Sequence, residues 1–514
     1  MLQAFEWELP ADSAHWKRLE NAALSLTLMG ITSVWMPPSC KGSGGIHDVG
    51  YGVYDLYDLG EFSQKGTVAT KYGTLAQLQQ AVRALHCGRI QVLGDCVLNH
   101  RIGADEKENV TVTPIRRDAR REALGAPYPA VCYTRFTFPG RGTQYSAYVW
   151  DHASFSGVDY AEPGKENALY LLADHTWSDQ VDMEMQSFDY LMGCNVDHQK
   201  PYVAEELTRW GLWFIEKTGM DGFRLDAVKH IHAPFFPAFL GDIRNRTRRE
   251  VYAVGEYWNA DTGALLSYLE RTGYCMDLFD VPLHFRLQAA SASMGQFDMR
   301  TLFDGTLTAA RPASAVTFVD NHDTQPGQSL ESWVQGWFKK TAYALILLRE
   351  AGYPCVFWGD LYGIPAAGIG KVPELPLLLT LRRERAYGPQ RDYMDDPHII
   401  GFVREGLPEL PFSGLVVLCT NAEGGEKRMQ VGPQLSRKRL VCLLGGQKDV
   451  TVSSDGYASF SVADAGLSVY GLPGGVPSLL HRMRRQLQTA GSFALRSLAS
   501  RLLPESLANL FLKG

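Results

Sequence analysis

Several features that would tie a protein to a membrane or a nucleic acid are missing from this sequence of 514 residues. No stretch is long and apolar enough to cross a bilayer, and the N-terminus lacks the basic and apolar segments of a secretory signal. The net charge of −6 gives no general positive field that would attract nucleic acid. We therefore expect a cytoplasmic protein with no transmembrane segment and no nucleic-acid partner.

Paired cysteines are also missing. The nine cysteines are scattered along the chain, and no two of them form a CxxC pair. Several lie inside apolar runs, such as Cys96 in VLGDCVLNH and Cys355 in PCVFW. This pattern is typical of buried, reduced thiols, and it counts against a disulfide framework.

A Gly-rich dinucleotide fingerprint is absent from the first strand–helix turn, which disfavours a doubly wound open sheet. Strand-like and helix-like segments nevertheless alternate, and we count eight such units. This number matches an α/β fold of the (β/α)8 TIM-barrel type, which needs about 250 residues plus insertions. The predicted barrel strands cover residues 2–7, 31–38, 89–100, 222–228, 251–258, 275–281, 315–323 and 354–361.

Two segments rich in predicted β-strand lie outside this alternation. Residues 101–202, after the third barrel strand, contain short alternating runs among Gly, Pro and Asp, which predicts an irregular insertion domain. Residues 392–472 contain closely spaced strand candidates separated by turn residues, which predicts an antiparallel β-sandwich. The catalytic barrel would then comprise residues 1–100 and 203–391.

The last segment, residues 473–514, differs in charge from the rest of the chain. It contains six basic residues and one acidic residue, and its leucines recur at helical spacing. A basic amphipathic helix can lie on a membrane surface or bind a protein partner. It can equally pack on its own protein or stay poorly ordered, and the sequence leaves these alternatives open.

Acidic residues stand at the ends of three predicted barrel strands. They are Asp226 in GFRLDAVKH, Glu256 in AVGEYW and Asp323 in FVDNHD. The carboxyl ends of barrel strands meet at one edge, where such proteins carry out chemistry. Arg224 lies two residues before Asp226 and faces the same side, so it can keep that carboxylate ionised. A nucleophilic carboxylate opposite a protonated one is what glycoside hydrolysis requires.

Taken together, these segments resemble the α-amylase family, family 13 of the glycoside hydrolases. Outside the acidic motifs, LQAFEW, GITSVWMPP and DVGYGVYDLYDLGEF are also similar to that family. The resemblance covers roughly residues 1–472 and is closest to the liquefying-type bacterial enzymes and their intracellular relatives. The four family signatures occur in order, as GDCVLNH (94–100), GFRLDAVKH (222–230), GEYW (255–258) and FVDNHD (318–323).

The resemblance implies a role for each acidic residue. Asp226 would be the nucleophile that forms a covalent glycosyl ester, and Glu256 would be the acid/base. The acid must stay protonated near neutral pH while its neighbour stays ionised. Asp323 would stabilise the distorted sugar and the transition state through ring hydroxyls.

The same resemblance implies a set of substrate-binding residues beside Arg224. His100 and His322 would hydrogen-bond the sugar at the cleavage position, and Tyr51 would stack beneath it. Lys229 and His230 would bind the leaving-group side of the glucan.

The resemblance further implies a structural Ca²⁺ between the barrel and the insertion, held by oxygen ligands. Asn99, Asp189 and the backbone carbonyl of His230 match the family pattern. Asn195 stands where the family usually has Asp, and Ser156 replaces another acidic residue. Fewer negative charges predict weaker Ca²⁺ binding, with an empty or Na⁺-filled site as the alternative.

The sequence thus predicts a monomeric, retaining enzyme that cleaves internal α-1,4-glucosidic bonds of starch, glycogen or maltodextrins. A transglycosylase or an oligosaccharide-specific α-glucosidase of the same family is the first alternative. The second alternative is an inactive glucan-binding protein of the same fold. The intact set of Asp226, Glu256 and Asp323 counts against this last possibility.

Overall fold

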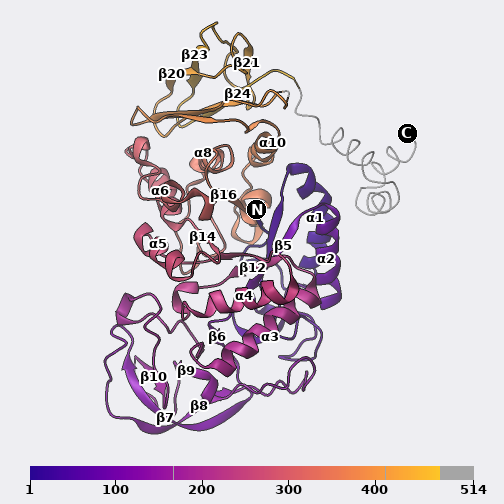
Figure 1. Cartoon of the computed structure of the whole chain (residues 1–514), viewed down its shortest axis with the longest axis vertical. Helices are drawn as coiled ribbons and strands as arrows, with labels where there is room; N and C mark the ends of the chain where they lie inside the picture. Colours follow the sequence, from indigo (N-terminus) through magenta and orange to yellow (C-terminus); the bar gives the residue numbers. More distant parts are fainter. Residues whose placement is uncertain (166, 411, 475–514) are drawn as a thin grey trace, which may run out of the picture.

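The computed structural model describes residues 1–165, 167–410 and 412–474, and its centre is a closed barrel of parallel strands (Figure 1). Neighbouring strands follow one another in chain order around the barrel, and the last strand pairs with the first. The (β/α)8 prediction is confirmed. The strands are β1 (Leu2–Gln3), β2 (Ser33–Met36), β5 (Gln91–Cys96), β12 (Gly222–Leu225), β13 (Tyr252–Gly255), β14 (Asp277–Phe279), β15 (Ala315–Phe318) and β16 (Tyr353–Phe357).

The register of the barrel strands determines which polar side chains meet. Every residue of β2, β12 and β15 is buried, as expected for parallel strands with both faces covered. Arg224 in β12 pairs with Asp95 in β5 on one side and with Val254 in β13 on the other. Asp226 and Glu256 directly follow β12 and β13, so both emerge at the carboxyl edge beside Arg224.

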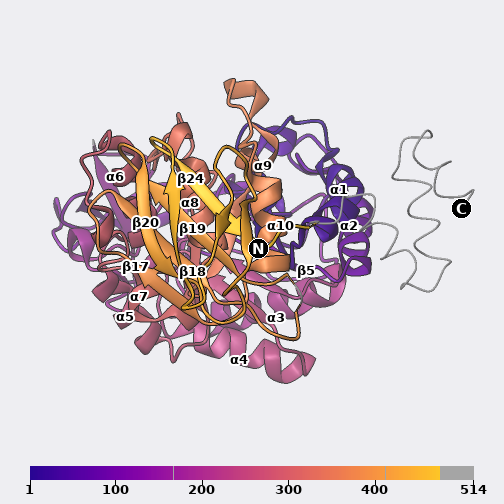
Figure 2. The same ribbon diagram turned by 90° about the horizontal axis from the view of Figure 1, so that it is seen from above.

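Helices surround the barrel and pack on its strands (Figures 1 and 2). Local sequence defines their ends: Thr74 and Gln77 form a reciprocal capping box before one helix, and Gly30 ends another in the left-handed conformation. The main helices are α1 (His15–Met29), α2 (Leu75–Cys87), α3 (Pro201–Thr218), α4 (Phe235–Thr247), α5 (Thr262–Arg271), α6 (Val281–Ala292), α8 (Gly336–Leu347) and α10 (Leu375–Arg385).

The predicted β-rich insertion forms a six-stranded antiparallel sheet at the carboxyl end of the barrel, at the bottom of Figure 1. Its edge strand β6 (His100–Arg101) lies four residues after β5, so the first insertion residues also border the barrel mouth. The other strands are β7 (Glu106–Arg116), β8 (Tyr128–Arg135), β9 (Phe155–Val158), β10 (Ala168–Leu172) and β11 (Cys194–Val196).

The C-terminal β-structure covers the opposite end of the barrel (Figures 1 and 2). A six-stranded sheet packs against a strand pair, β20 (Gly425–Gln430) with β23 (Tyr457–Val462), around a separate apolar core. The edge strand β17 (Gln390–Tyr393) begins before the predicted start of this β-structure. The remaining strands are β18 (Ile399–Arg404), β19 (Leu415–Thr420), β21 (Arg439–Cys442), β22 (Val450–Thr451) and β24 (Leu467–Gly471).

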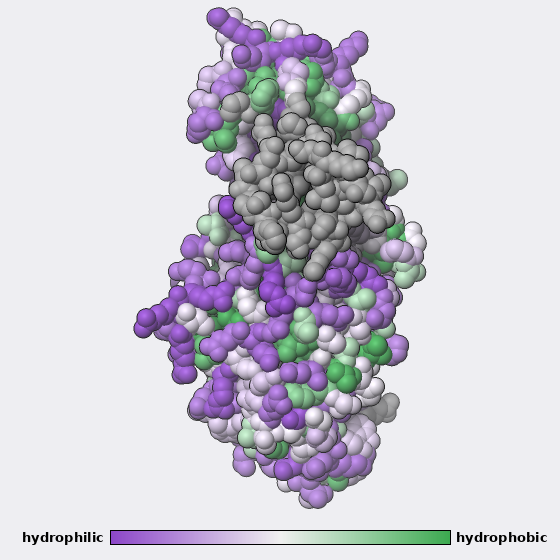
Figure 3. All heavy atoms as spheres, turned by 90° about the vertical axis from the view of Figure 1, so that its right-hand side faces the viewer, coloured by the Kyte–Doolittle hydropathy of each residue, from purple (hydrophilic) through white to green (hydrophobic). Residues whose placement is uncertain are grey.

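The described surface is mainly hydrophilic on the face shown in Figure 3. On the face in Figure 3, hydrophilic side chains surround small hydrophobic patches, and no described helix has the length and apolarity to span a membrane. The tail predicted as a helix falls, from residue 475 on, outside the described residues. None of the cysteines forms a disulfide, and six of the nine are buried, whereas Cys87 at the end of α2 is exposed.

Candidate active site

A cavity of about 640 Å³ opens at the carboxyl edge of the barrel, between the barrel and the insertion. Seven of the nine residues predicted to act on the substrate line it. Arg224 and His322 are fully buried behind the cavity wall. The lining includes Trp7, Tyr51, His100, Asp226, Lys229, His230, Glu256, Trp258 and Asp323.

Arg224 connects the carboxyl groups below the cavity floor. Its Nη1 donates to Asp226 Oδ1 at 2.6 Å and to Asp95 Oδ1 at 3.0 Å. Its Nη2 donates to Glu256 Oε2 at 2.6 Å. Asp226 and Glu256 therefore accept from the two ends of one guanidinium, which holds them on the same side of the cavity.

Burial changes the protonation of these acids. It raises the pKa of Asp226 to about 6, although the Arg224 charge opposes the rise. Burial also raises the pKa of Glu256, and the nearby negative charge of Asp226 adds to that effect. The pKa of Asp323 rises well above its ordinary value through burial and the charge of Glu256. One guanidinium cannot keep four buried carboxyls ionised, so part of the set is protonated near neutral pH.

Asp323 lies beside its neighbour His322, without a hydrogen bond between the two side chains. The Gln3 side-chain nitrogen lies 3.0 Å from His322 Nδ1, and because an amide nitrogen can only donate, Nδ1 must accept. The ring proton is then on Nε2, which lies 3.2 Å from Asp323 Oδ2. The loop that carries both residues is fixed by Asn321, whose Oδ1 accepts from the backbone N–H groups of Asp323 and Thr324.

Three parallel rings stack at one wall of the site, two of them lining the cavity and the third, His322, buried behind it. Tyr51 stacks on His322 with centroids 5.1 Å apart, and Trp7 stacks on Tyr51 at 5.8 Å. The Tyr51 hydroxyl donates to Asp95 Oδ2 at 2.9 Å, which fixes the tyrosine ring. Neither Trp7 nor Asp95 was predicted as a site residue. Asp95 could have been found from the strand register, because it lies opposite Arg224 in the neighbouring strand.

The remaining predicted binding residues occupy the rim. His100 Nε2 lies 2.7 Å from the backbone oxygen of Tyr51, and burial lowers the pKa of His100 to about 4. Lys229 pairs with Glu184 at 3.2 Å, and His230 Nδ1 lies 2.7 Å from the backbone oxygen of Phe188. His230 and His100 are therefore neutral, whereas Lys229 brings a positive charge to this side.

The four residues predicted to bind metal also come together, behind the rim. Asn99 Nδ2 lies 3.2 Å from the His230 carbonyl oxygen and 3.4 Å from that of Asp189. Asn195 Nδ2 donates to Ser156 Oγ at 2.8 Å and to Asp189 Oδ1 at 3.2 Å. We call Asn99, Ser156, Asp189, Asn195 and the His230 carbonyl the oxygen cluster.

The oxygen cluster contains a single acidic group. Burial raises the pKa of Asp189 to about 7, because its hydrogen bonds from Ser178 and Asn195 do not offset the loss of water. Asn195 Oδ1 is buried and makes no hydrogen bond. Among the described residues, no three His, Cys, Asp or Glu side chains are grouped so that they could hold a metal. The cluster thus contains one carboxylate and several neutral oxygens, one of which, Asn195 Oδ1, makes no hydrogen bond.

Comparisons of the sequence with known proteins agree with this geometry. The family described as "Alpha amylase, catalytic domain" matches residues 25–371. The chain is 48% identical to an alpha-amylase of Geobacillus stearothermophilus over 474 residues, which covers 91% of this chain and 86% of that protein. It is 40% identical to the cytoplasmic alpha-amylase of Escherichia coli (strain K12) over 486 residues, with coverages of 91% and 98%.

Solved structures show the same fold. An alpha-amylase from Geobacillus thermoleovorans, crystallised with acarbose, matches with a TM-score of 0.60 at 20% identity, covering 90% of this chain and 93% of that one. An Anoxybacillus alpha-amylase matches with a TM-score of 0.61 at 19% identity, with coverages of 93% and 97%. On the sequence matches together with this barrel, the chain belongs to the alpha-amylase family of glycoside hydrolases.

Proposed function

We propose that this α-1,4-glucan hydrolase cleaves internal bonds of starch, glycogen or maltodextrins with retention of configuration. The observation that carries the proposal is the Arg224 guanidinium, which contacts both Asp226 and Glu256. A retaining enzyme needs its two carboxyl groups about 5–5.5 Å apart, and one shared guanidinium keeps such a pair close.

In the first step Asp226 acts as the nucleophile. With a pKa of about 6, it is mostly ionised at neutral pH and can attack the anomeric carbon. Glu256, with its raised pKa, is the proton donor, and its proton passes to the glycosidic oxygen as the bond to the leaving glucan breaks. The products of this step are a covalent glycosyl–Asp226 ester and a shortened chain.

In the second step Glu256 works in reverse. Its carboxylate takes a proton from a water molecule, whose oxygen attacks the anomeric carbon and releases Asp226. The negative charge of ester-bound Asp226 is absent in the intermediate, so the pKa of Glu256 falls once its proton has been transferred. Two inversions at the same carbon give net retention.

The other residues bind and orient the sugar. Asp323 lines the same cavity as Asp226 and Glu256, where it can accept hydrogen bonds from ring hydroxyls of the distorted sugar. Tyr51, supported by Trp7 and Asp95, provides an apolar face for the ring. Lys229 and His230 lie on the side of the leaving chain. Arg224 and His322 are buried, so we infer that they act through Asp226, Glu256 and Asp323.

The roles can be tested by replacing the proton donor. Glu256→Gln should lower kcat on amylose by about 10²–10⁴-fold, because an amide cannot supply the proton. Glucan binding should persist, since the amide keeps a similar shape. Glu205→Gln, on the exposed surface of α3, is the matched control and should retain full activity. Turnover that survives in Glu256→Gln would show that another residue is the acid.

Product analysis separates this proposal from its alternatives. NMR of the anomeric proton at early times should show α-products if the enzyme is retaining. Internal cleavage should produce a fast loss of amylose length with mixed oligosaccharides. Longer products from maltodextrins would indicate a transglycosylase, and activity on short substrates alone would indicate an α-glucosidase.

We also propose that the oxygen cluster binds one Ca²⁺ weakly. Its residues fit this ion in kind, because Ca²⁺ takes carboxylate, amide and carbonyl oxygens, and Asn195 Oδ1 has no other partner. A bound Ca²⁺ would supply positive charge that joins the insertion to the barrel. The amide nitrogen of Asn99 contacts the His230 carbonyl oxygen, and that of Asn195 contacts Asp189 Oδ1. An ion that used these oxygens would have to compete with the internal hydrogen bonds.

We also propose that the enzyme is cytoplasmic and monomeric. The unpaired cysteines are compatible with a reducing compartment, and one relative is named as a cytoplasmic alpha-amylase. Cell fractionation with a marker for each compartment tests the location, and light scattering tests the monomer.

A further inference from the structure

A second charged cavity, of about 340 Å³, lies at the end of the barrel opposite the active site. Its lining includes Thr32 just before β2 and Tyr353 at the start of β16, so it sits at the amino ends of barrel strands. The C-terminal sheet closes its other side. Four arginines line this arginine cavity, namely Arg349 after α8, Arg382 and Arg383 in α10, and Arg404 in β18.

Among the described residues, no acidic side chain forms a hydrogen bond or ion pair with three of these arginines, although the charge of Glu350 acts on Arg404. Arg382 Nη1 donates to the Leu347 carbonyl oxygen, and Arg383 Nη1 to the carbonyl oxygens of Thr27 and Leu28. Arg404 donates through Nε to the carbonyl oxygen of Gly388, at 3.0 Å. Within the described residues, the Nη2 groups of Arg382, Arg383 and Arg404 make no hydrogen bond and no ion pair. Arg404 also donates through Nη1 to the Leu348 carbonyl oxygen, at 3.4 Å. Each guanidinium is thus held in place by backbone carbonyl oxygens, with its Nη2 donors left over.

The surrounding charges do not balance these arginines. Arg349 is already neutralised by Asp392, which it contacts at 2.7 and 3.0 Å. Glu350 is the only acidic residue that lines the cavity within the described part of the chain, and it is exposed. Burial lowers the pKa of Arg382, and the nearby charge of Arg404 lowers it further. The cavity therefore carries an excess of positive charge, on the buried Arg404 and the half-buried Arg382 and Arg383.

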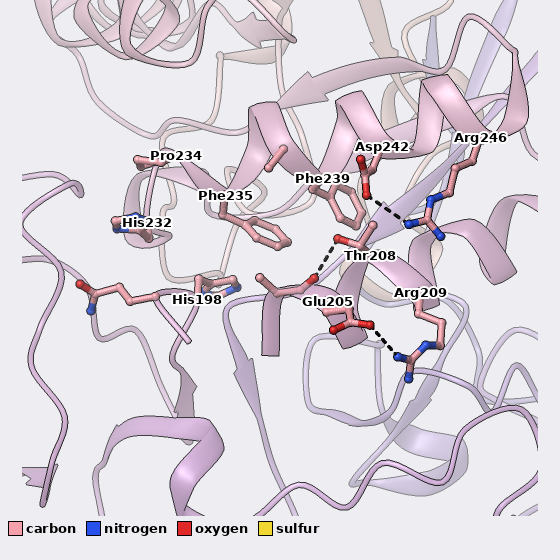
Figure 4. A pocket seen from close by; sticks show the side chains of 13 residues that line it. His198, Glu205, Thr208, Arg209, His232, Pro234, Phe235, Phe239, Asp242 and Arg246 are labelled. Carbon is pink, nitrogen blue, oxygen red and sulfur yellow. Dashed lines mark hydrogen bonds and ion pairs between the residues drawn. The ribbon is translucent and has the colours of Figure 1, made fainter. Parts of the chain in front are cut away.

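A surface hollow on the other side of the barrel provides a comparison, because its two arginines have acidic partners. This hollow, of about 460 Å³, lies between α3 and α4 and is also lined by two arginines (Figure 4). Here each arginine has an acidic partner, since Arg209 pairs with Glu205 and Arg246 pairs with Asp242. The unmatched guanidinium groups of the arginine cavity are a different arrangement.

We propose that the arginine cavity binds a small phosphate-bearing anion, either free phosphate or the phosphate group of a small phosphomonoester. Guanidinium groups match phosphate oxygens with paired N–H donors, and three unpaired groups suit a dianion better than a monoanion. The volume is at the lower end of small-molecule pockets, which span about 300–1,000 Å³, so a glucan chain does not fit.

The position of the cavity determines the effect of binding. Arg382 belongs to the barrel helix α10, and Arg404 belongs to the C-terminal sheet, so one anion would link the two parts of the molecule. Binding to the folded state alone raises the melting temperature, and the rise grows with the logarithm of the ligand concentration once that exceeds the dissociation constant. The catalytic acids lie at the other end of the barrel, so turnover should stay unchanged.

The test uses calorimetric titration of the full-length protein with inorganic phosphate at pH 7.5, at constant ionic strength set with NaCl. We expect saturable binding and a rise in melting temperature that chloride does not reproduce. Arg382→Gln should weaken phosphate binding by about tenfold or more, because a charged hydrogen-bond donor is lost. The phosphate affinity of Arg382→Lys should lie between those of the wild type and Arg382→Gln. Arg246→Gln removes one charge from the exposed hollow and should bind phosphate like the wild type.

A second titration with a hexose monophosphate identifies the source of the phosphate. Tighter binding than inorganic phosphate assigns the cavity to a phosphomonoester, and weaker binding assigns it to free phosphate. Absence of saturable binding by both anions overturns the proposal, as does an unchanged phosphate affinity in Arg382→Gln. If Arg382→Gln does not fold, Arg382→Lys and the anion dependence of wild-type melting decide the question.

Discussion

The catalytic floor and the oxygen cluster both bury an aspartate, but they compensate it differently. At the floor, Asp226 accepts a hydrogen bond from Arg224 at 2.6 Å, and burial raises its pKa only to about 6. In the oxygen cluster, Asp189 receives hydrogen bonds only from neutral donors, and burial raises its pKa to about 7. A guanidinium thus compensates the charge of one buried carboxyl, whereas the other carboxyl has only neutral hydrogen-bond donors beside it.

The difference relates to what each region does. The floor needs a fixed charge at the moment of attack, and an arginine supplies it without exchange with solvent. The oxygen cluster has an uncompensated charge, which either a proton or a cation can balance. The charge of a buried carboxylate is therefore balanced permanently, by Arg224, beside the reacting bond. In the oxygen cluster it is balanced by a proton or a cation, which can exchange with solvent.

An Asp→Asn substitution at Asp226 and at Asp189 should distinguish a catalytic role from a structural one. Asp226→Asn should lower kcat by about 10³-fold or more, because the amide cannot form the covalent ester. Asp189→Asn should leave kcat within a few-fold, because Asp189 does not line the active-site cavity. Steady-state rates on soluble starch, with circular dichroism to verify folding, measure both effects. Comparable losses in the two variants would contradict the division of roles.

The pH dependence of kcat/KM should report the charge at the floor. Asp226 attacks only when ionised, so activity should fall about tenfold per unit as the pH drops below about 6. The negative charge of Asp95 raises the pKa of Asp226. Asp95→Asn should therefore shift this acid limb to lower pH, even though the variant loses activity. A limb that stays in place would mean that another group controls it.

Much of this architecture follows from sequence, because alternating apolar segments report burial directly. Seven of the eight barrel strands fall within predicted segments, and β16 begins one residue before its own, at Tyr353, while β1 contains only Leu2 and Gln3 of the predicted residues 2–7. Its pairing with β2 and β16 stops there, and the chain turns so that Trp7 reaches the active site. The strand β17, with the sequence QRDY, was missed because it has no alternating apolar residues.

Site residues that lie at the end of a single predicted strand could be predicted from the sequence. Arrangements that need several distant segments to come together could not. Asp226, Glu256 and Asp323 end barrel strands or follow them closely, so their convergence could be predicted, while their roles remain predictions. The ring stack of Trp7, Tyr51 and His322 joins three distant segments, and local sequence contains no trace of it. The arginine cavity is similarly invisible in sequence, because the absence of ion pairs at Arg382, Arg383 and Arg404 among the described residues is a property of the folded chain.

Restoring charge to the oxygen cluster should strengthen Ca²⁺ binding. Asn195→Asp replaces an amide that donates to Asp189 with a carboxylate, which adds a negative ligand and removes a competing donor. We expect the Ca²⁺ dissociation constant to fall by about tenfold or more, equivalent to about 1.4 kcal/mol. Calorimetric titration of EDTA-treated protein measures the change.

The control for this substitution places the same charge nearby but outside the cluster. Gln199→Asp, three residues beyond β11, adds one carboxylate at an exposed turn and should have a smaller effect on Ca²⁺ affinity. Without Ca²⁺, Asn195→Asp should be less stable than the wild type, since two buried carboxyls then repel each other. Equal Ca²⁺ affinity in Asn195→Asp and the wild type would argue against an ion at this position.

The smallest expected effect lies in the pH dependence of stability. The pKa of Asp189 is higher in the folded protein, at about 7, than its ordinary value of 3.8, so the folded state binds the proton more tightly. This group should therefore lower stability progressively as the pH rises from about 4 to 7, and Asp189→Asn should lack that component. In EDTA, the wild type should lose a few degrees more of melting temperature between pH 5 and pH 8 than the variant. Saturating Ca²⁺ should remove the difference, because a bound cation favours the ionised carboxylate. A wild-type stability that instead increases over this range, relative to Asp189→Asn, would place a permanent positive charge in the oxygen cluster and make it resemble the catalytic floor.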